Sequence, residues 1–208
     1  MLQKLHHQPT PSNMNNWTIS RRVIAGFAAM LLIIVTLGAF ALWRLMGLAE
    51  DIAYVADNSV PSILTLSEAA NISRANLILL LQIDPSNTTD RNSVLERKIF
   101  TNGARRDELI KSYESLISDA EDRRLYEEIK RTSGVARASR GRALELLKGN
   151  KVDEFRKVQQ EEVIPEYEKY LKAIDITVDY KAKLGQSTAD AGKASALFSV
   201  RLIGAALG

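Results

Sequence analysis

An uncharged apolar run from Val23 to Leu42 dominates the pattern of hydrophobic and polar positions along the chain. With a rise of about 1.5 Å per residue, a helix over this run spans roughly 30 Å, the thickness of a bilayer's hydrocarbon core. The run exceeds the ~7–15-residue apolar core of a signal peptide and ends at Trp43 without a small-residue cleavage site. We therefore predict a retained transmembrane helix over residues 23–43, with a cleaved signal peptide and a buried soluble helix as the alternatives.

The rest of the chain divides into four polar segments with helical periodicity. In each segment apolar residues recur every three or four positions, and no stretch alternates long enough to indicate a strand. Clusters of turn-forming residues at 84–87, 119–122 and 149–150 separate the segments. The predicted segments cover residues 44–83, 89–118, 122–148 and 152–208. This pattern predicts an all-α fold.

The lengths of these segments predict their arrangement. The first segment, and the fourth up to Lys193, are each long enough for about 60 Å of helix, whereas the middle two are shorter. Short connections force successive helices to run antiparallel. We therefore predict a transmembrane helix that continues into an up-down-up-down antiparallel four-helix bundle over residues 44–193. The first and fourth helices of this bundle then both return to the membrane.

Two prolines interrupt the predicted helices. Pro61 lacks the N–H group that would bond to Asp57, and Pro165 lacks the one that would bond to Glu161. We expect a local bend at both positions, with a functional hinge as the alternative interpretation.

The first helix of the bundle carries two neighbouring stripes of apolar and small residues. One stripe consists of Ile52, Val55, Ser59, Ser62, Leu66, Ala69, Ser73 and Leu80, and the other of Ala56, Val60, Ile63, Ala70, Leu77 and Leu81. We predict that one stripe faces the core of its own bundle and that the other packs on a second copy of the chain, which gives a homodimer. A single broad core face, common in bundle helices, is the alternative.

Composition narrows the range of functions. The 208 residues carry a net charge of +3 and include no cysteine and two histidines, which excludes disulfides and thiolate metal sites. His6 and His7 lie in a polar tail without a third ligand, so we expect neither a metal site nor a cofactor. Without histidine or cysteine in the helical region we predict that the protein is not an enzyme. No basic run with interleaved aromatic residues points to nucleic acid.

Charges around the apolar run predict its orientation. Arg21 and Arg22 precede the run without an acidic residue, whereas Glu50 and Asp51 follow it closely. The positive-inside rule then places the N-terminus in the cytoplasm, with residues 1–16 as a disordered cytoplasmic tail. The bundle is expected on the other side of a bacterial inner membrane, in the periplasm of a Gram-negative host.

The two ends of the chain add further expectations. Met14 offers a second start site after the polar tail. Residues 194–208 are apolar except for Arg201 but fall short of the ~20 residues that cross a bilayer. We interpret them as the start of a truncated second transmembrane helix, with an amphipathic helix on the membrane surface as the alternative.

Four short motifs carry a family resemblance. They are Asn16–Arg22 (NWTISRR), Ser59–Ile63 (SVPSI), Val163–Leu171 (VIPEYEKYL) and Lys193–Leu202 (KASALFSVRL). Together they make residues 14–208 resemble the N-terminal part of bacterial methyl-accepting chemotaxis proteins, with a four-helix-bundle ligand-binding domain. The HAMP domain and cytoplasmic coiled coil of those receptors are not in this sequence.

The resemblance implies a sensor function. It implies a membrane-anchored module that works as a homodimer, binds a small molecule or a periplasmic binding protein, and passes the ligand state to the cytoplasm by displacement of the fourth helix. The same module also precedes histidine kinases and diguanylate cyclases, so their input domains are an alternative. A membrane-anchored bundle that binds a partner protein without sensing is the other alternative.

The resemblance also suggests one ligand-binding residue. Family members that sense amino acids bind them between two subunits with arginines of the first helix. Here the outer half of the first helix offers Arg74, whose guanidinium can hold a small carboxylate through two hydrogen bonds. Counting from the helix ends places Glu161 and Glu162 of the fourth helix at the same depth. A salt bridge between helices is therefore the alternative interpretation of Arg74.

Overall fold

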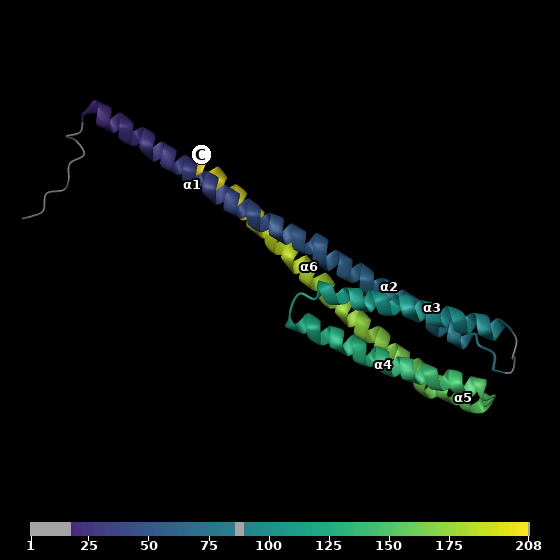
Figure 1. Cartoon of the computed structure of the whole chain (residues 1–208). Coiled ribbons are helices and arrows are strands. Elements are labelled where there is room, and N and C mark those ends of the chain that lie inside the picture. The colour runs from purple at the N-terminus through teal and green to yellow at the C-terminus, as the bar shows by residue number, and fades with distance from the viewer. Residues whose placement is uncertain (1–17, 86–89, 208) are drawn as a thin grey trace, which may run out of the picture. The chain divides into compact units, whose positions relative to one another are not determined.

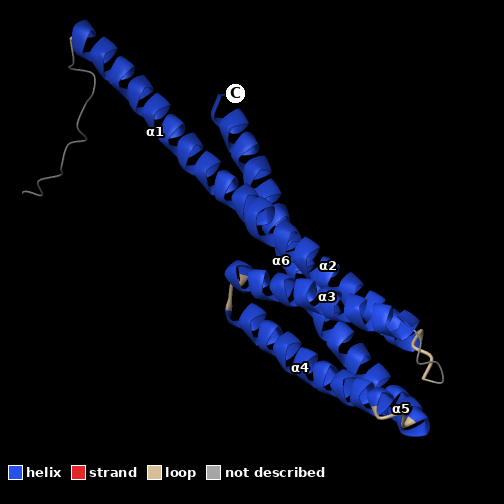
Figure 2. Cartoon of the chain, turned by 45° about the vertical axis from the view of Figure 1, so that its right-hand side comes forward, coloured by secondary structure: helices blue, strands red, loops and turns tan. Residues whose placement is uncertain are grey.

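The computed structural model describes residues 18–85 and 90–207, and these residues form helices joined by short connections, without strands (Figures 1 and 2). The elements in chain order are α1 (Ile19–Tyr54), the π-helix η2 (Val55–Ser59), α2 (Val60–Leu81), α3 (Asp90–Tyr113), the 3₁₀-helix η3 (Glu114–Leu116), α4 (Ala120–Lys148), α5 (Val152–Val158), the π-helix η4 (Gln159–Val163) and α6 (Ile164–Leu207). The predicted all-α fold is confirmed. The predicted tail over residues 1–16, with His6 and His7, lies outside the described residues.

The chain forms two compact units. Of the described residues, those up to Gly47 together with those from Ala196 onward make the first unit, and Leu48–Ser195 belong to the second. In the second unit α1, η2 and α2 act as the first helix of a bundle, and α5, η4 and α6 act as its fourth helix. Successive helices run antiparallel, as Figure 1 shows.

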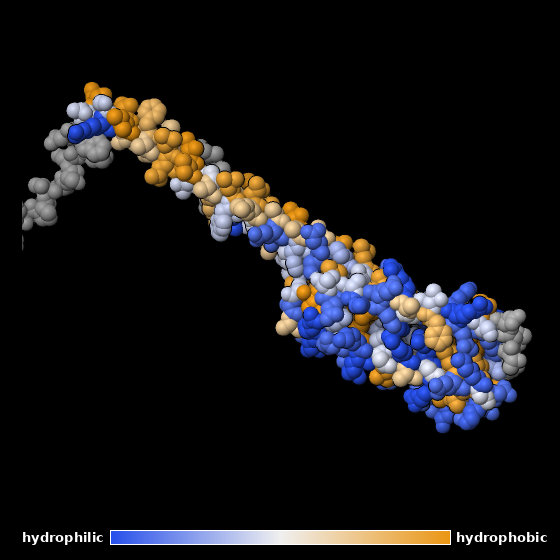
Figure 3. Space-filling model, in the orientation of Figure 1, coloured by the Kyte–Doolittle hydropathy of each residue, from blue (hydrophilic) through white to orange (hydrophobic). Residues whose placement is uncertain are grey.

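The first unit contains a strongly apolar stretch of helix. Many of its large hydrophobic side chains are more than half exposed, among them Phe27, Leu32 and Val35 at 65–69%. Figure 3 shows a hydrophobic surface along this part of α1. Among the described residues one helix, Ile19–Leu81, is long and apolar enough to cross a membrane. Exposing so large a continuous apolar surface to water is unfavourable, and its length fits the hydrocarbon core of a bilayer.

The C-terminal part of α6 packs against α1 within this first unit. The Nε–H of Arg44 donates to the hydroxyl of Ser199 at 3.1 Å. The guanidinium of Arg44 also lies 6.0 Å from the centre of the Phe198 ring. The only described cation at this end of the apolar stretch of α1 is therefore held by residues of α6.

The second unit is built around one core. Its fully buried side chains come from α2, α3, α4, α5 and α6 and are mostly large: Leu66, Leu80, Ile99, Tyr113, Ile129, Phe155, Tyr167 and Ile174. Burying side chains of this size is the main stabilising contribution to such a bundle, at about 1.5–3 kcal/mol for each large aliphatic residue.

The first predicted stripe faces this core from Ser59 onward. Ser59, Leu66 and Leu80 are buried, while Ile52, at the start of the stripe, is 60% exposed. The second stripe is mixed: Ala70 is buried, and Val60 and Leu81 are 46% and 49% exposed. Leu64 is also exposed, at 64%. We call Ile52, Val60, Leu64 and Leu81 the apolar flank of α1 and α2, because the chain itself leaves about half or more of each side chain uncovered.

Both prolines are directly preceded by a π-helical turn. η2 ends two residues before Pro61, and η4 ends two residues before Pro165. In these turns the amide of Val60 bonds to the carbonyl of Val55, and the amide of Ile164 bonds to that of Gln159. Proline has no N–H group, and its ring crowds the preceding turn of the helix. The wider π-turn makes room for the ring and keeps the N–H of the residue before the proline hydrogen-bonded. The disruption predicted at each proline takes this form.

α4 begins and ends at chemically defined caps. Asp119 precedes it in an extended conformation and accepts the amide of Asp122 at 2.9 Å, as an N-cap does. The helix ends at Lys148, followed by Gly149 and by Asn150 with φ of 55°. The predicted end is therefore correct, while the helix begins two residues before the predicted start because Asp119 acts as a cap and not as a break.

Replacing this cap is our first testable prediction. The Asp119→Ala variant is expected to lose about 1 kcal/mol of unfolding free energy, the usual effect of removing an N-cap. Burial would raise the pKa of the Asp119 carboxyl, but the hydrogen bonds from Tyr180 and from the Asp122 amide lower it below its usual value. The contribution is therefore complete above the unfolded-state pKa of about 3.9 and disappears as the pH falls through the lower folded-state pKa. Denaturant unfolding at pH 7 and pH 3 measures this, and an equal loss at both values would contradict it.

Glycines on α6 allow a close approach to the first helix. A Cβ atom at Gly185 would lie 2.9 Å from the Cβ atom of Ser59. A Cβ atom at Gly192 would lie 3.1 Å from Asp51 Oδ2 and 3.2 Å from Leu48 Cδ1. The backbones are therefore close at two levels separated by two helical turns.

The second prediction compares two glycine substitutions. Gly185→Ala is expected to destabilise the bundle by about 1–3 kcal/mol, because Ser59 Cβ is fixed to its backbone and cannot move aside. Gly134→Ala is the matched control on α4, where nothing lies within 4 Å of a new Cβ atom. It should instead stabilise the helix by about 0.5–1 kcal/mol. Thermal unfolding followed by circular dichroism separates the two, and equal effects would contradict the close contact.

Candidate functional site

The most unusual feature of the bundle is a charged cluster in its interior. Lys181 of α6 and Asp122 of α4 are both 0% exposed, and their Nζ and Oδ2 atoms lie 2.8 Å apart. The same ammonium donates to the side-chain oxygen of Asn58 at 2.7 Å and to the carbonyl oxygen of Leu116 at 2.9 Å. We call Lys181, Asp122, Asn58, Tyr113 and Ser118 the lysine cluster.

The remaining members of the lysine cluster hold the carboxylate of Asp122. The hydroxyl of Tyr113 donates to Asp122 Oδ1, and the backbone N–H of Ser118 donates to Oδ2 at 2.9 Å. Burial, followed by the hydrogen bond to Asp122, raises the pKa of Tyr113 well above its usual value, so the phenol remains a donor. Every charged atom of the pair thus has a partner, as a buried ion pair requires.

Two further tyrosines bind the connection between α3 and α4. The hydroxyl of Tyr180 donates to Asp119 Oδ2 at 2.7 Å, and the hydroxyl of Tyr54 donates to Ser118 Oγ at 3.2 Å. The hydrogen bond to Asp119 raises the pKa of Tyr180 above its usual value. The connection is therefore bonded to α1 on one side and to α6 on the other.

A second buried charge, Arg106, pairs with an exposed carboxylate on α3 that also pairs with α4. Arg106 of α3 is 2% exposed and donates to Asp107 Oδ1 at 3.0 and 2.6 Å. Asp107 Oδ2 also accepts from Arg137 of α4 at 2.7 Å. The guanidinium of Arg106 lies 5.8 Å from the centre of the Tyr170 ring, within the range of a cation–π contact. Burial would lower the pKa of Arg106, but Tyr170 and Asp107 raise it, which keeps the cation charged.

Arg74, the predicted ligand-binding residue, lies on the surface between α2 and α6. Its NH2 group donates to Asp175 at 3.1 and 3.3 Å, and its NH1 group donates to Asn71 Oδ1 at 3.3 Å. Both partners of the ion pair are about half exposed, at 46% and 59%. Surface pairs of this kind contribute little to stability, which leaves Arg74 free to exchange partners.

The predicted carboxylate partner of Arg74 was wrong. Glu162 pairs with Arg142 of α4, and Glu161 with Lys157 one turn away. The prediction aligned the ends of the first and fourth helices, but Gln159 of η4 already lies level with Leu80, to whose carbonyl it donates at 3.0 Å. The first turns of the fourth helix therefore extend past the end of α2, so residues lower on α6 face Arg74.

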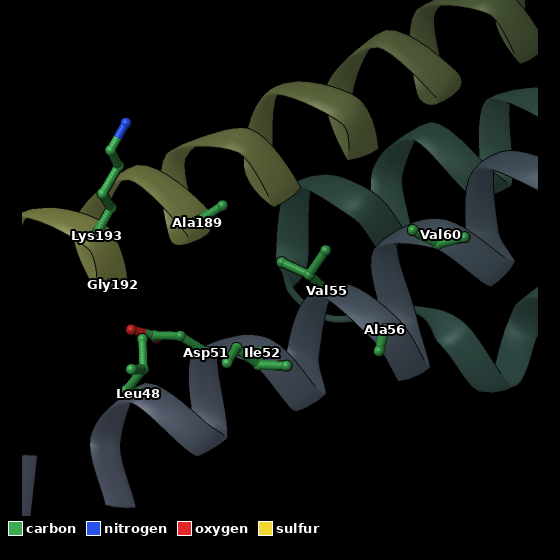
Figure 4. Close-up of a pocket in the computed structure, with 9 residues that line it drawn as sticks. All are labelled: Leu48, Asp51, Ile52, Val55, Ala56, Val60, Ala189, Gly192 and Lys193. Atoms are coloured by element: carbon green, nitrogen blue, oxygen red, sulfur yellow. The ribbon is translucent and has the colours of Figure 1, made fainter. Parts of the chain in front are cut away.

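An apolar groove lies between the first helix and α6 (Figure 4). It has a volume of about 460 Å³, with Leu48, Ile52, Val55, Ala56 and Val60 on one side and Ala189 and Gly192 on the other. Asp51 and Lys193 complete the lining, and Figure 4 shows the ammonium of Lys193 extending away from α1. The groove is continuous with the apolar flank that includes Ile52 and Val60.

A polar groove lies between α3 and α4. It has a volume of about 430 Å³, and its lining includes Lys111, Lys130 and Arg137 together with Asp107. Lys130 is paired with Glu127 at 3.2 Å, and Arg137 with Asp107. These two cations are compensated, as Arg74 is by Asp175, so this groove offers no stronger anion site than the surface around Arg74.

Sequence reasoning missed the buried charges, although a signal for one of them existed. Lys181 occupies a position in the apolar stripe of the fourth helix, between Val178 and Leu184, and a lysine in such a stripe needs a buried partner. The sequence did not identify Asp122 as the partner of Lys181, because Asp122 belongs to the acidic cluster at 119–122 that resembles a turn. Arg106 stands on a helix rich in surface charge and gave no signal.

These observations define a class of protein: a helical bundle, with a charged cluster in its core, continuous with a helix able to span a membrane. The model of a family of four-helix-bundle sensory modules for signal transduction matches residues 16–196. The chain belongs to this family, which confirms the resemblance to the sensory part of methyl-accepting chemotaxis proteins; the family is not a catalytic one. Comparisons with curated proteins and with solved structures gave no match.

Proposed function

We propose that the protein is the ligand-sensing input module of a chemotaxis-type transmembrane receptor. The observation that carries the proposal is the family match over residues 16–196 on a chain whose helix Ile19–Leu81 includes a stretch able to cross a membrane. In this proposal residues 23–43 are the first membrane span, residues 44–193 are the periplasmic sensor domain, and residues 194–208 begin a second span. The N-terminus is cytoplasmic, as the positive-inside rule indicates.

The active form in this proposal is a homodimer. The apolar flank of α1 and α2, with Ile52, Val60 and Leu64 at 46–64% exposure, supports it, because monomeric surfaces seldom expose apolar side chains side by side on one helix face. A symmetric dimer places the same flank of two chains face to face, so each copy supplies the cover that the other lacks. The groove of Figure 4 borders this interface.

The ligand in this proposal carries a carboxylate or a comparable anionic group. Arg74 offers a planar donor fork, and its present partner Asp175 is a surface carboxylate that a ligand carboxylate can replace. Sensors of amino acids in this family use several arginines, so a single Arg74 favours an organic acid or a periplasmic binding protein over an amino acid. Binding then favours one position of α6 through differential affinity, and α6 carries the change into the second span.

A ligand screen on the full chain in lipid nanodiscs tests the proposal. An organic acid present at about 100 times its Kd should stabilise the bundle by about 2.7 kcal/mol, which corresponds to a rise in Tm of about 5–10 °C. Arg74→Ala should abolish this rise. Arg105→Ala is the matched control, since Arg105 is an equally exposed arginine paired across helices with Glu68 at 3.2 Å. No shift with organic acids, amino acids or sugars would count against small-molecule sensing, and full affinity in Arg74→Ala would remove Arg74 from the site.

A further inference from the structure

The lysine cluster marks the level at which the four-helix packing ends. The connection between α3 and α4 lies here, bonded to Asn58 and Lys181 through the carbonyl of Leu116. Beyond this level Leu48–Tyr54 and Lys183–Ser195 continue as the two remaining helices of the unit. Contacts at the cluster therefore fix how this helix pair leaves the bundle.

The hydrogen bonds of Lys181 are specific for one axial position of α6. Its ammonium donates to Asn58 of η2, to Leu116 of η3 and to Asp122 of α4, at 2.7–2.9 Å in each case. These three acceptors lie on different elements, so sliding α6 by one residue, about 1.5 Å, cannot keep all three bonds at their present lengths. Each bond that breaks leaves a cation in the core with fewer partners, which costs stability at a buried site.

The neighbouring contact fixes the separation of the same two helices. One turn from Lys181, Gly185 lies directly against Ser59, with no room for even a methyl group. Asn58 and Ser59 both belong to the π-turn before Pro61. One turn of the first helix thus supplies both the acceptor for the lysine and the surface against which the glycine rests.

We propose that the lysine cluster is a register lock, a set of contacts that holds α6 at one axial position relative to the first helix. The lock then also sets the relative axial position of the helix pair beyond the cluster, Leu48–Tyr54 and Lys183–Ser195. The signalling consequence rests on the proposed function: a stimulus that slides α6 toward the membrane has to break the cluster, so the lock stabilises the resting state. The register itself is a property of the bundle and is testable without a ligand.

Disulfide formation measures the register directly, because the natural chain contains no cysteine. A Cβ atom at Gly192 lies 3.5 Å from Asp51 Cβ, within the range of about 3.5–4.5 Å that a disulfide requires. The experiment places one cysteine at Asp51 and a second at Ala189, Gly192 or Ser195, in the full chain in nanodiscs. The rates of oxidation of the three pairs give a register profile, which should be dominated by the Asp51→Cys/Gly192→Cys pair.

Lys181→Met, which keeps the volume and removes the charge, should flatten this profile. The rate of the Gly192 pair relative to the offset pairs should fall about tenfold, the factor for one charge-assisted hydrogen bond. Lys169→Met is the matched control on α6, because Lys169 is 62% exposed and pairs with Glu166 within its own helix at 2.6 Å. The control should leave the profile unchanged.

Two further variants keep the test decisive if Lys181→Met does not fold. Asn58→Ala removes one acceptor and leaves the ion pair, and it should flatten the profile partially. Lys181→Met/Asp122→Leu makes this part of the core apolar and should flatten the register profile fully, while circular dichroism shows native helix content.

A folded variant that keeps the wild-type register profile, in particular the apolar double variant, would overturn the register lock and leave the cluster with a purely stabilising role. A missing ligand response would affect only the proposed function.

Discussion

Replacing Asp122 by alanine is expected to lower the free energy of unfolding by about 3–5 kcal/mol, the usual effect of removing one partner from a buried ion pair. Lys181 is 0% exposed, so its ammonium would remain in the core without the carboxylate that neutralises it. Tyr113 would also lose the acceptor of its hydroxyl. Urea unfolding followed by circular dichroism measures the loss.

Two control variants distinguish this effect from a general loss of stability. Lys181→Met/Asp122→Leu should recover part of the loss, because replacing both charged partners by apolar side chains of similar volume is close to neutral for the pair itself, while Tyr113 still lacks its acceptor. Asp175→Ala, which breaks the exposed pair with Arg74, should cost about 1 kcal/mol or less. If the Asp122 and Asp175 variants lost equal stability, the buried pair would not have the role described here.

Leu66→Ala is expected to cost about 2–5 kcal/mol, the range for truncating a buried leucine. Leu66 is 0% exposed on the core face of α2, whereas Leu64, two residues earlier, is 64% exposed on the apolar flank. Leu64→Ala should therefore change the stability of the monomer by no more than about 0.5 kcal/mol. The two variants make the same substitution two residues apart, so the burial of the leucine is the main difference between them.

The same two variants separate folding from association. Sedimentation of the full chain in detergent should show weaker dimerisation for Leu64→Ala, whereas Leu66→Ala should act on unfolding. Equal losses of stability in the two variants would contradict the assignment of the faces. Unchanged association in Leu64→Ala would count against the proposed dimer interface but not against the fold.

The register lock and the proposed sensor function make different demands on α6. A sensor needs α6 to have two positions that a ligand can select, and the lysine cluster strongly favours one of them. The exposed pair between Arg74 and Asp175 lies farther along the bundle and contributes little. A ligand at Arg74 would therefore act where the helices are weakly coupled, against a position set by Lys181.

Local patterns in the sequence were sufficient for the helices and for the class of protein. The apolar run from Val23 to Leu42 predicted a helix long and apolar enough to cross a membrane, because length and lack of charge are properties of one segment. The helical period predicted the all-α fold and the core face with Leu66. Gly149 predicted the end of α4 because a helix stop depends on neighbouring residues alone.

Only the tertiary structure decided which residues on different helices lie at the same level. Periodicity shows which face of a helix is buried but not how far each helix is shifted along its neighbour. For this reason the sequence paired Arg74 with Glu161 or Glu162, where the structure pairs it with Asp175. For the same reason the sequence did not predict the contact between Lys181 and Asp122. This contact depends on the axial register of two packed helices, and all the core contacts together set that register.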